Sequence, residues 1–313
     1  MKTLLKGLQK TRHHRKGLPP QPTGGFTMIE LLVGMIIATL IITPMLTFVV
    51  NILDGDVREQ AKTNTEQELQ TAIDYIAQDM SQAVYVYDAA GVGLIEDELP
   101  DPGPTNPAVD DPKEPILVFW KREFVENALA FGGGICANPD TDSCNDTFVL
   151  SLVAYYLIDD NNSTWCEPSG GTCPKRIARF QIQDGVKDLS GNYVCDQDSD
   201  GDGRSSQCQD DTDLRNFQRD LGFNSFNKDD ATGWTKNGSE TYSNDAVVLI
   251  NYAEGFELNS VDNNKLADIT IVGNAKRRVP GNFSDLTCSV TDPSPYCPKA
   301  TARVGARSGY GEQ

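Results

Sequence analysis

The feature that constrains this chain most is an uncharged run of 20 residues at positions 31–50, LLVGMIIATLIITPMLTFVV. An α-helix rises about 1.5 Å per residue, so this run is roughly 30 Å long, which is the thickness of the hydrocarbon core of a bilayer. Gly34 and Pro44 weaken a helix in water but are tolerated in a membrane helix. We therefore predict a transmembrane helix over residues 31–50, in preference to a buried core helix.

Charges on the two sides of the run predict its orientation. The run is followed by NILDGDVREQ, which is mostly acidic or neutral. Residues 1–25 contain no acidic residue and six basic ones, which are Lys2, Lys6, Lys10, Arg12, Arg15 and Lys16. Because positive charge near a span stays in the cytoplasm, we predict a cytoplasmic leader and an exported body. The expected location is the inner membrane, crossed once, with the body in the periplasm or on a cell-surface filament.

The composition of the exported body excludes several functions. The leader holds six of the 27 basic residues, so the remaining 288 residues carry 21 basic and 45 acidic residues, a net charge of −24. Such a body repels phosphate backbones, and we expect no nucleic-acid partner. Both histidines, His13 and His14, lie in the leader, which disfavours Ser/His/Asp and Cys/His catalysis. We expect that the protein is not an enzyme, although paired carboxylates of the glycosidase kind stay open as an alternative.

The junction between leader and run holds the candidate processing site. A secretory signal peptide carries a small-residue cleavage site after its apolar run, and nothing of the AxA kind follows Val50. The small residues lie before the run instead, at Gly24 and Gly25, so cleavage here removes the leader and keeps the helix. Glu30 stands at the start of the run, where an ionisable group is costly unless it is paired or functional.

This arrangement of basic leader, Gly25, Phe26, Thr27, Glu30 and apolar span resembles the class III signal of type IV pilins and type II secretion pseudopilins. The resemblance implies cleavage by a prepilin peptidase between Gly25 and Phe26, methylation of the new Phe26 amine, and Glu30 as the fifth mature residue. A neighbouring subunit's amine would lower the cost of a buried Glu30 carboxylate, so we expect Glu30 to be an assembly contact. Pro44 falls earlier in the span than the kinking proline of many major pilins, so the position of the kink is not carried over.

Beyond the span the helix is predicted to continue to residue 84. One apolar stripe on this part recurs in steps of three and four residues, as expected for a soluble amphipathic helix: Leu69, Ile73, Ile76, Met80 and Ala83. The whole helix would cover residues 26–84, about 59 residues or some 90 Å if straight. We expect its second half to pack on a sheet.

Runs rich in β-branched and aromatic residues follow, separated by loops full of Pro, Asp, Asn and Gly. They predict strands over residues 116–120, 148–158, 177–182, 246–252 and 267–272. The expected fold class is therefore α+β, with the long N-terminal helix packed on an antiparallel β-sheet that carries large disulfide-stapled loop insertions. Residues 85–313 would form the exported β-rich head, and the last segment, RVGARSGYGEQ, a loose tail.

All eight cysteines lie in the exported part, where an oxidising compartment favours disulfides. Their spacing falls into four close couples, which predicts nearest-neighbour bridges. The predicted pairs are Cys136 with Cys144, Cys166 with Cys173, Cys195 with Cys208, and Cys288 with Cys297. Zinc sites of four cysteines are the alternative, and they would require CxxC-like knuckles, which the sequence lacks.

The third couple encloses the acidic segment CDQDSDGDGRSSQC, a candidate calcium loop. Alternating carboxylates followed by glycine match the first half of an EF-hand loop in two registers. The candidate ligands are Asp196, Asp198, Asp200 and Asp202. In the first register the twelfth position is Gln207, so Asp210, Asp211 or Asp213 would supply the last ligand and the affinity would suit millimolar calcium. A solvated acidic turn is the alternative, although four close aspartates repel one another without a cation.

These features together favour a minor pilin or pseudopilin. The long leader, the span, the insertions and the cysteine count resemble most the hormogonium polysaccharide secretion pseudopilins of filamentous cyanobacteria, which implies a role in polysaccharide secretion and gliding motility. The partners implied are other pilins or pseudopilins, a prepilin peptidase, the inner-membrane assembly platform and membrane lipid. Two alternatives stay open: a minor pilin of a motility, adhesion or DNA-uptake pilus, and a membrane-anchored calcium-dependent adhesin or carbohydrate enzyme that never polymerises.

Overall fold

The structure of the chain is a computed structural model. The described residues are 24–99, 113–131, 144–159, 165–166, 173–183, 185–187, 190, 246–279, 281 and 285–305. The chain divides into two compact units, Met1–Asp54 and Gly55–Gln313. We describe each unit by itself, although one helix, α1, contributes to both.

Helix α1 covers Met28–Met80 and includes Pro44 in its interior. The prediction of residues 26–84 was therefore too long at both ends. The helix starts after Thr27, and its last turn is followed by a turn at Ser81 and Gln82 and then by strand β1, Ala83–Val86. The helix was predicted to continue to residue 84 because Ala83 follows the apolar spacing of the stripe, but pairing with β2 makes this segment a strand.

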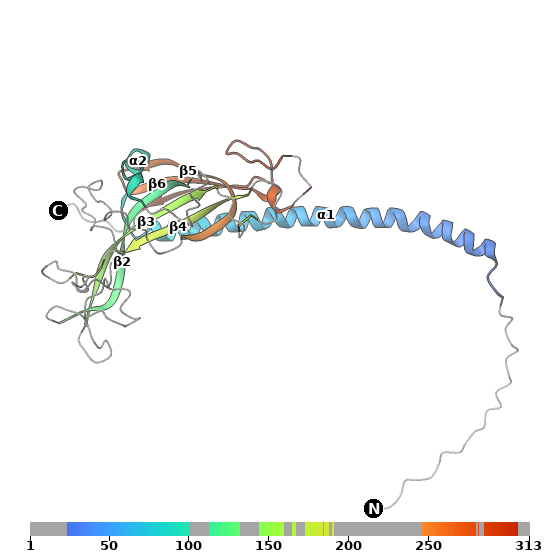
Figure 1. The fold of residues 1–313 in the computed structure, drawn as a ribbon, viewed down its shortest axis with the longest axis horizontal. Helices are drawn as coiled ribbons and strands as arrows, with labels where there is room; N and C mark the ends of the chain where they lie inside the picture. The colour runs from blue at the N-terminus through green and yellow to red at the C-terminus, as the bar shows by residue number, and fades with distance from the viewer. Residues whose placement is uncertain are drawn as a thin grey trace, which may run out of the picture. The chain divides into compact units, whose positions relative to one another are not determined.

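The described strands of unit Gly55–Gln313 form one antiparallel sheet in the order β1-β2-β3-β4-β5-β6-β7, so each described strand pairs with its neighbours in sequence. Figure 1 labels strands β2 to β6 of this sheet. After β1 the strands are β2 (Lys113–Ala130), β3 (Cys144–Ile158), β4 (Lys175–Gln183), β5 (Val247–Asp262), β6 (Leu266–Gly273) and β7 (Lys299–Gly305). All five predicted strands are confirmed. Strands β1 and β7 were missed, and β7 takes up residues 303–305 of the segment predicted to be a loose tail.

The second half of α1 packs on one face of this sheet. The predicted stripe of Leu69, Ile73, Ile76 and Met80 is buried and shares a core with side chains from the strands, such as Phe119 and Val153. Ala83 is buried as well, but it lies in β1. The expected helix, antiparallel sheet and disulfides are thus present, and the α+β class describes the fold.

The opposite face of strands β2, β3 and β4 forms a second apolar cluster. Because side chains alternate along a strand, Leu117 and Phe119 belong to the α1 side whereas Val118 and Trp120 belong to the other. Helix α2, Ala89–Ile95, packs its apolar residues into this second cluster, and a 3-10 turn, η1 (Glu96–Glu98), follows it. Residues on both sides of the central strands are therefore buried.

The turn between β5 and β6 is hydrogen-bonded to strand β1, the first strand in the order of the sheet. Asn263 and Asn264 have φ angles of 52° and 53°, a left-handed conformation that asparagine tolerates better than most residues. The Asn264 carbonyl accepts a hydrogen bond from the Val86 amide at 2.8 Å, and the Asn264 side chain donates one to the Val86 carbonyl at 3.0 Å. Segments 178 residues apart in sequence are joined in this way.

Close contact between α1 and β6 depends on a glycine. A Cβ atom on Gly273 would lie 2.5 Å from Cγ2 of Thr65 and 3.1 Å from Cδ1 of Leu69. Thr65 is fully buried and its hydroxyl donates to the Ala61 carbonyl at 2.8 Å. The hydrogen bond to Ala61 fixes the Thr65 side chain, so the end of β6 comes this close to the helix only because residue 273 has no side chain.

Candidate functional site

The predicted processing junction lies in the described residues and is not helical. Residues 24–27 have no regular secondary structure, and α1 begins at Met28. The Thr27 hydroxyl accepts a hydrogen bond from the Glu30 amide at 3.3 Å, and the Thr27 carbonyl accepts the first helical hydrogen bond, from the Leu31 amide, at 3.2 Å. Thr27 is therefore the N-cap of α1, and the Gly25–Phe26 bond precedes the cap by one residue.

The junction is also exposed. Phe26 is 83% exposed, and within the described part of the chain no atom beyond the adjoining residues lies within 4 Å of the positions where Cβ atoms on Gly24 and Gly25 would stand. The structure thus presents the Gly25–Phe26 peptide bond in an exposed segment without regular secondary structure. Accessible segments of this kind are where proteolytic cleavage concentrates.

Glu30 is the single acidic residue in the first turn of α1. Within the described part of the chain, no side chain forms an ion pair or a hydrogen bond with the Glu30 carboxylate. This acid is therefore presented without a partner from the described residues.

The first half of α1 is long and apolar enough to cross a membrane, and no residue of its most apolar window is buried inside the structure. Its threonine hydroxyls are satisfied within the helix. Thr39 donates to the Ile36 carbonyl at 2.9 Å, Thr43 to the Thr39 carbonyl at 2.8 Å, and Thr47 to the Thr43 carbonyl at 3.1 Å. Because lipid offers no hydrogen bonds, these internal bonds make the threonines compatible with a span.

A buried polar cluster that the sequence analysis missed lies between α1 and the sheet. Asp79, in the last turn of α1, accepts hydrogen bonds from Lys121 of β2 at 3.0 Å, from the Tyr155 hydroxyl of β3 at 2.8 Å, and from Arg179 of β4 at 2.7 Å. The strand register produces this convergence, because Tyr155 stands directly opposite Arg179. We call these four residues the Asp79 cluster.

Electrostatics in the Asp79 cluster favour the ionised carboxylate. Burial by itself raises the pKa of Asp79, but the hydrogen bond and charge of Arg179, the charge of Lys121 and the Tyr155 hydroxyl together lower this pKa below its ordinary value of 3.8. Burial and the neighbouring Asp79 charge raise the pKa of Tyr155, which keeps its hydroxyl protonated as a donor. The cluster continues through Gln181 to Glu123, which also accepts a hydrogen bond from Ser151 at 3.0 Å.

A signal for this cluster was present in the sequence. Asp79 follows Ile76 by three residues and precedes Met80, so it stands on the apolar stripe rather than on the polar face of α1. Lys121, Tyr155 and Arg179 are 42, 76 and 100 residues away from it. Only the sheet register brings them together. We interpret the cluster as a structural contact between α1 and the sheet, since each of its charges is paired and desolvated.

Two of the four predicted disulfides are present, Cys166–Cys173 and Cys288–Cys297. Cys144 is also disulfide-bonded, and its predicted partner, Cys136, lies outside the described residues. The predicted pair of Cys195 and Cys208 lies outside them as well. The reading of the cysteines as disulfides rather than zinc ligands is confirmed for the described cysteines.

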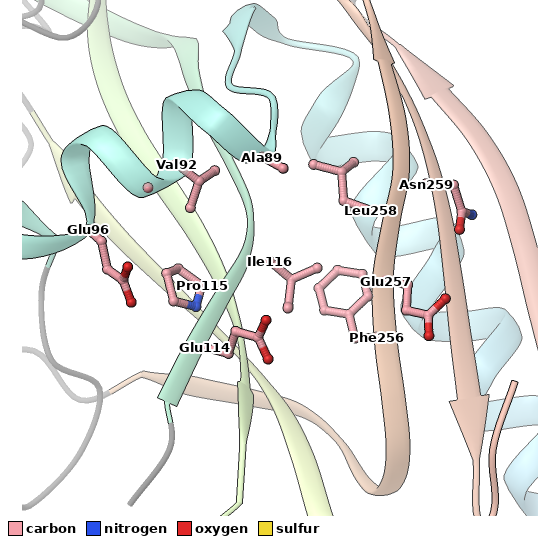
Figure 2. Close-up of a pocket in the computed structure, with 11 residues that line it drawn as sticks. Ala89, Val92, Glu96, Glu114, Pro115, Ile116, Phe256, Glu257, Leu258 and Asn259 are labelled. Atoms are coloured by element: carbon pink, nitrogen blue, oxygen red, sulfur yellow. The ribbon is translucent and has the colours of Figure 1, made fainter.

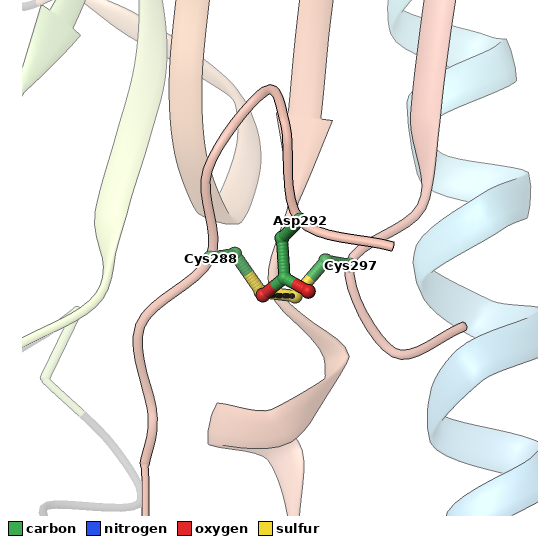
Figure 3. A group of neighbouring side chains, drawn as sticks. All are labelled: Cys288, Asp292 and Cys297. Carbon is green, nitrogen blue, oxygen red and sulfur yellow. Dashed lines mark hydrogen bonds between the residues drawn. A yellow bond between two sulfur atoms is a disulfide. The ribbon is translucent and has the colours of Figure 1, made fainter. Parts of the chain in front are cut away.

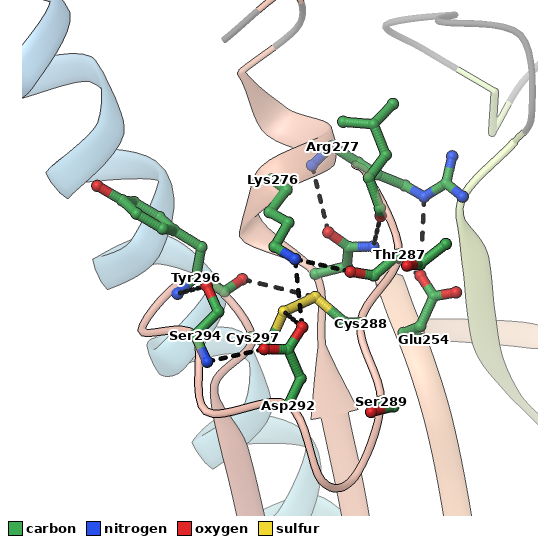
Figure 4. Close-up of a disulfide and its surroundings, with 12 residues drawn as sticks. Glu254, Lys276, Arg277, Thr287, Cys288, Ser289, Asp292, Ser294, Tyr296 and Cys297 are labelled. Carbon is green, nitrogen blue, oxygen red and sulfur yellow. Dashed lines mark hydrogen bonds and ion pairs between the residues drawn. A yellow bond between two sulfur atoms is a disulfide. The ribbon is translucent and has the colours of Figure 1, made fainter. Parts of the chain in front are cut away.

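Cys288, Asp292 and Cys297 form the one group of three potential metal ligands within the described ranges (Figure 3). Both sulfur atoms belong to the disulfide, so neither is a thiolate that binds a metal. Asp292 instead pairs with the Lys276 ammonium at 3.2 Å and accepts a hydrogen bond from the Ser294 amide at 2.8 Å (Figure 4). These contacts favour a loop closed by a disulfide and an ion pair over a metal site.

The predicted calcium ligands, Asp196, Asp198, Asp200 and Asp202, lie outside the described residues. The structure therefore leaves the calcium prediction as it stood.

One pocket of about 450 Å³ lies between α2, the start of β2 and the middle of β5 (Figure 2). Apolar side chains line part of it, including Val92, Ile116 and Phe256. Glu96, Glu114 and Glu257 also line it, but their carboxylates are not gathered closely enough to form a metal-ligand group. A pocket of this chemistry disfavours anions.

The chain was compared with models of known protein families, with curated proteins and with solved structures, and it matches none of them. The interpretation of the site therefore depends on the residues and contacts described above.

Proposed function

We propose that this protein is a minor pseudopilin-like or pilin-like subunit, anchored in the inner membrane by the first half of α1 and assembled through that helix into a type II secretion or type IV pilus-like filament. The observation that carries the proposal is the processing junction. An exposed, non-helical Gly25–Phe26 bond directly precedes a capped apolar helix whose first turn contains Glu30.

The state of Glu30 supports an intermolecular role. A carboxylate next to lipid is costly unless a cation pairs with it. The described residues offer it no partner, whereas the amine created at Phe26 by cleavage is a cation that a neighbouring copy or another subunit would supply. In the proposed filament this pair sets the register of one helix against the next.

The proposed cargo is polysaccharide, with gliding motility as the cellular outcome. This part of the proposal is supported by the resemblance of the leader, the span and the cysteine-rich insertions to the hormogonium polysaccharide secretion pseudopilins. A deletion strain scored separately for piliation, motility and released polysaccharide tests it. Loss of polysaccharide with pili retained is expected, and loss of pili with polysaccharide retained would contradict the assignment of cargo.

The assembly role has its own test, which is the substitution Glu30→Gln. The amide keeps the shape of the side chain but removes its charge. We expect the variant precursor to be cleaved and to reach the membrane, while its recovery in sheared filament fractions falls at least tenfold. Asp56→Asn, the corresponding amide substitution of an exposed acid further along α1, is the matched control and is expected to assemble as the wild type does. Normal incorporation of Glu30→Gln would refute the proposed contact.

A further inference from the structure

We propose that Thr27 is a positioning residue for leader removal, because its side chain caps the start of α1 one residue after the scissile bond and so keeps the Gly25–Phe26 peptide bond outside the helix. This inference rests on the proposed function, since it concerns how the peptidase gains access to its substrate bond. It assigns to Thr27 a role in the precursor, before any filament exists.

The Thr27 hydrogen bond has the direction of a helix cap. The Thr27 hydroxyl accepts from the Glu30 amide at 3.3 Å, three residues ahead, which is the geometry of an N-cap. The other hydroxyls of this half of the helix act in the opposite sense. Thr39, Thr43 and Thr47 donate to carbonyls of the preceding turn and leave the helix continuous. Thr27 therefore marks a helix start, whereas the other three lie in its interior.

Without the Thr27 cap, we expect α1 to begin further upstream. The apolar run beyond residue 27 propagates a helix strongly, and a helix once nucleated extends at little cost per residue. Alanine at position 27 offers no side-chain acceptor and has the highest helix propensity. Extension by one turn would move the unsatisfied amides of the helix start away from lipid, which favours a start upstream of Phe26.

The peptidase requires a scissile bond that lies outside the helix. A proteolytic enzyme must reach the backbone carbonyl and amide of the bond that it cleaves, and in a helix these groups are bonded internally. Cleavage then depends on the fraction of molecules in which the segment is open. Gly24 and Gly25 oppose the helix through their low propensity, and the Thr27 cap adds a fixed boundary next to them.

The test uses the full-length precursor in vesicles of phosphatidylethanolamine and phosphatidylglycerol together with a purified prepilin peptidase, and follows loss of the leader by intact mass. The variants are Thr27→Ala, which removes the acceptor, Thr27→Ser, which restores it, and Thr43→Ala, a matched threonine of the same helix that does not cap. We expect Thr27→Ala to be cleaved two- to fivefold more slowly, the upper value being that of a typical N-cap, and the other two at the wild-type rate.

A second measurement reads the boundary itself. Carbon-13 shifts of residues 24–31 in detergent micelles report where the helix begins, and we expect a start at Met28 in the wild type and in Thr27→Ser, and at or before Phe26 in Thr27→Ala. An unmoved start in Thr27→Ala would overturn the cap. A moved start with unchanged cleavage would overturn its role in processing. Wild-type precursor that is not cleaved after Gly25 would overturn the proposed function instead, so the two failures are distinguishable.

Discussion

Two acidic residues of helix α1, Glu30 in its first half and Asp79 in its second half, have opposite surroundings. Asp79 is buried and accepts hydrogen bonds from three strands of its own chain. Glu30 is exposed, and the described residues give its carboxylate no partner. A carboxylate that the fold has satisfied contributes to stability, whereas one that the fold leaves free is available to another molecule. An acidic residue of α1 therefore has a structural role at Asp79 and, in our proposal, an assembly role at Glu30.

The largest expected effect comes from breaking the Asp79 cluster. Asp79→Ala leaves Lys121 and Arg179 buried without their counter-charge, which costs about 3–5 kcal/mol in the free energy of unfolding. Urea denaturation of the full chain in detergent measures it. Asp74→Ala is the control, because Asp74 is exposed on the same helix and bonds only Gln70 at 3.0 Å, so its loss is expected to cost less than about 0.5 kcal/mol. Equal effects of the two substitutions would refute the structural assignment of Asp79.

Removing the disulfide Cys288–Cys297 is the next largest change. The bond closes a loop with a sequence separation of 9, and its loss through Cys288→Ser together with Cys297→Ser is expected to cost about 2–3 kcal/mol. Denaturation with and without reductant checks the value, since reductant should destabilise the wild type more than the double variant. A double variant as stable as the oxidised wild type would show that this loop does not contribute to the head.

Overpacking at Gly273 is expected to cost about 1–3 kcal/mol. Gly273→Ala places a Cβ atom 2.5 Å from Cγ2 of Thr65, and Thr65→Ser in the same chain should recover much of the loss because it removes that methyl group. Gly255→Ala is the control, because its Cβ would meet Val272 at an ordinary 3.5 Å. A double-mutant cycle without coupling between positions 65 and 273 would contradict the close contact of β6 with α1.

Acid dependence gives a smaller and more specific effect. The native pKa of Asp79 is lowered below the ordinary 3.8, so the unfolded state binds the proton more tightly. The stability that Asp79 contributes is therefore complete above about pH 4 and is lost as the pH falls from 3.8 towards the lower native value. Asp79→Asn should flatten this part of the stability profile between pH 4 and pH 2, approximately. A profile unchanged by Asp79→Asn would refute the ionised cluster.

The smallest effect on stability is expected at the other acid. Glu30→Gln should change the free energy of unfolding by less than about 0.5 kcal/mol, because no described contact of the native chain is lost. The same denaturation assay used for Asp79→Ala measures it. A loss of several kcal/mol would show that Glu30 is structural after all and would remove the contrast between the two acids.

The sequence was sufficient for elements whose side chains repeat with a clear period. The stripe from Leu69 to Met80 predicted which face of α1 is buried, and β-branched runs predicted β2 to β6. It was not sufficient for short elements. Strand β1 continues the spacing of the helix before it, and helix α2 contains two glycines, Gly91 and Gly93, that suggest a loop. Tertiary pairing and the cap by Asp88, whose carboxylate accepts from the Gly91 amide at 2.7 Å, decide these cases.

The processing junction and the Asp79 cluster differ in how well the sequence alone predicts them. The predicted processing junction is local, so the residues that mark it are neighbours in sequence, and they are exposed in the structure. The Asp79 cluster joins residues from one helix and three strands, and its members become neighbours only through the register of the sheet. A lone acid on an apolar stripe was the one trace of it in the sequence.

The most direct test of the account is the intact mass of the protein purified from membranes of cells that contain a prepilin peptidase, beside cells in which that peptidase is inactive. We predict a chain that begins at Phe26 with a methylated amine in the first case, and a chain that retains residues 1–25 in the second. A chain that keeps its leader in both would contradict the proposed function, because without cleavage no free amine would exist at Phe26 to pair with Glu30.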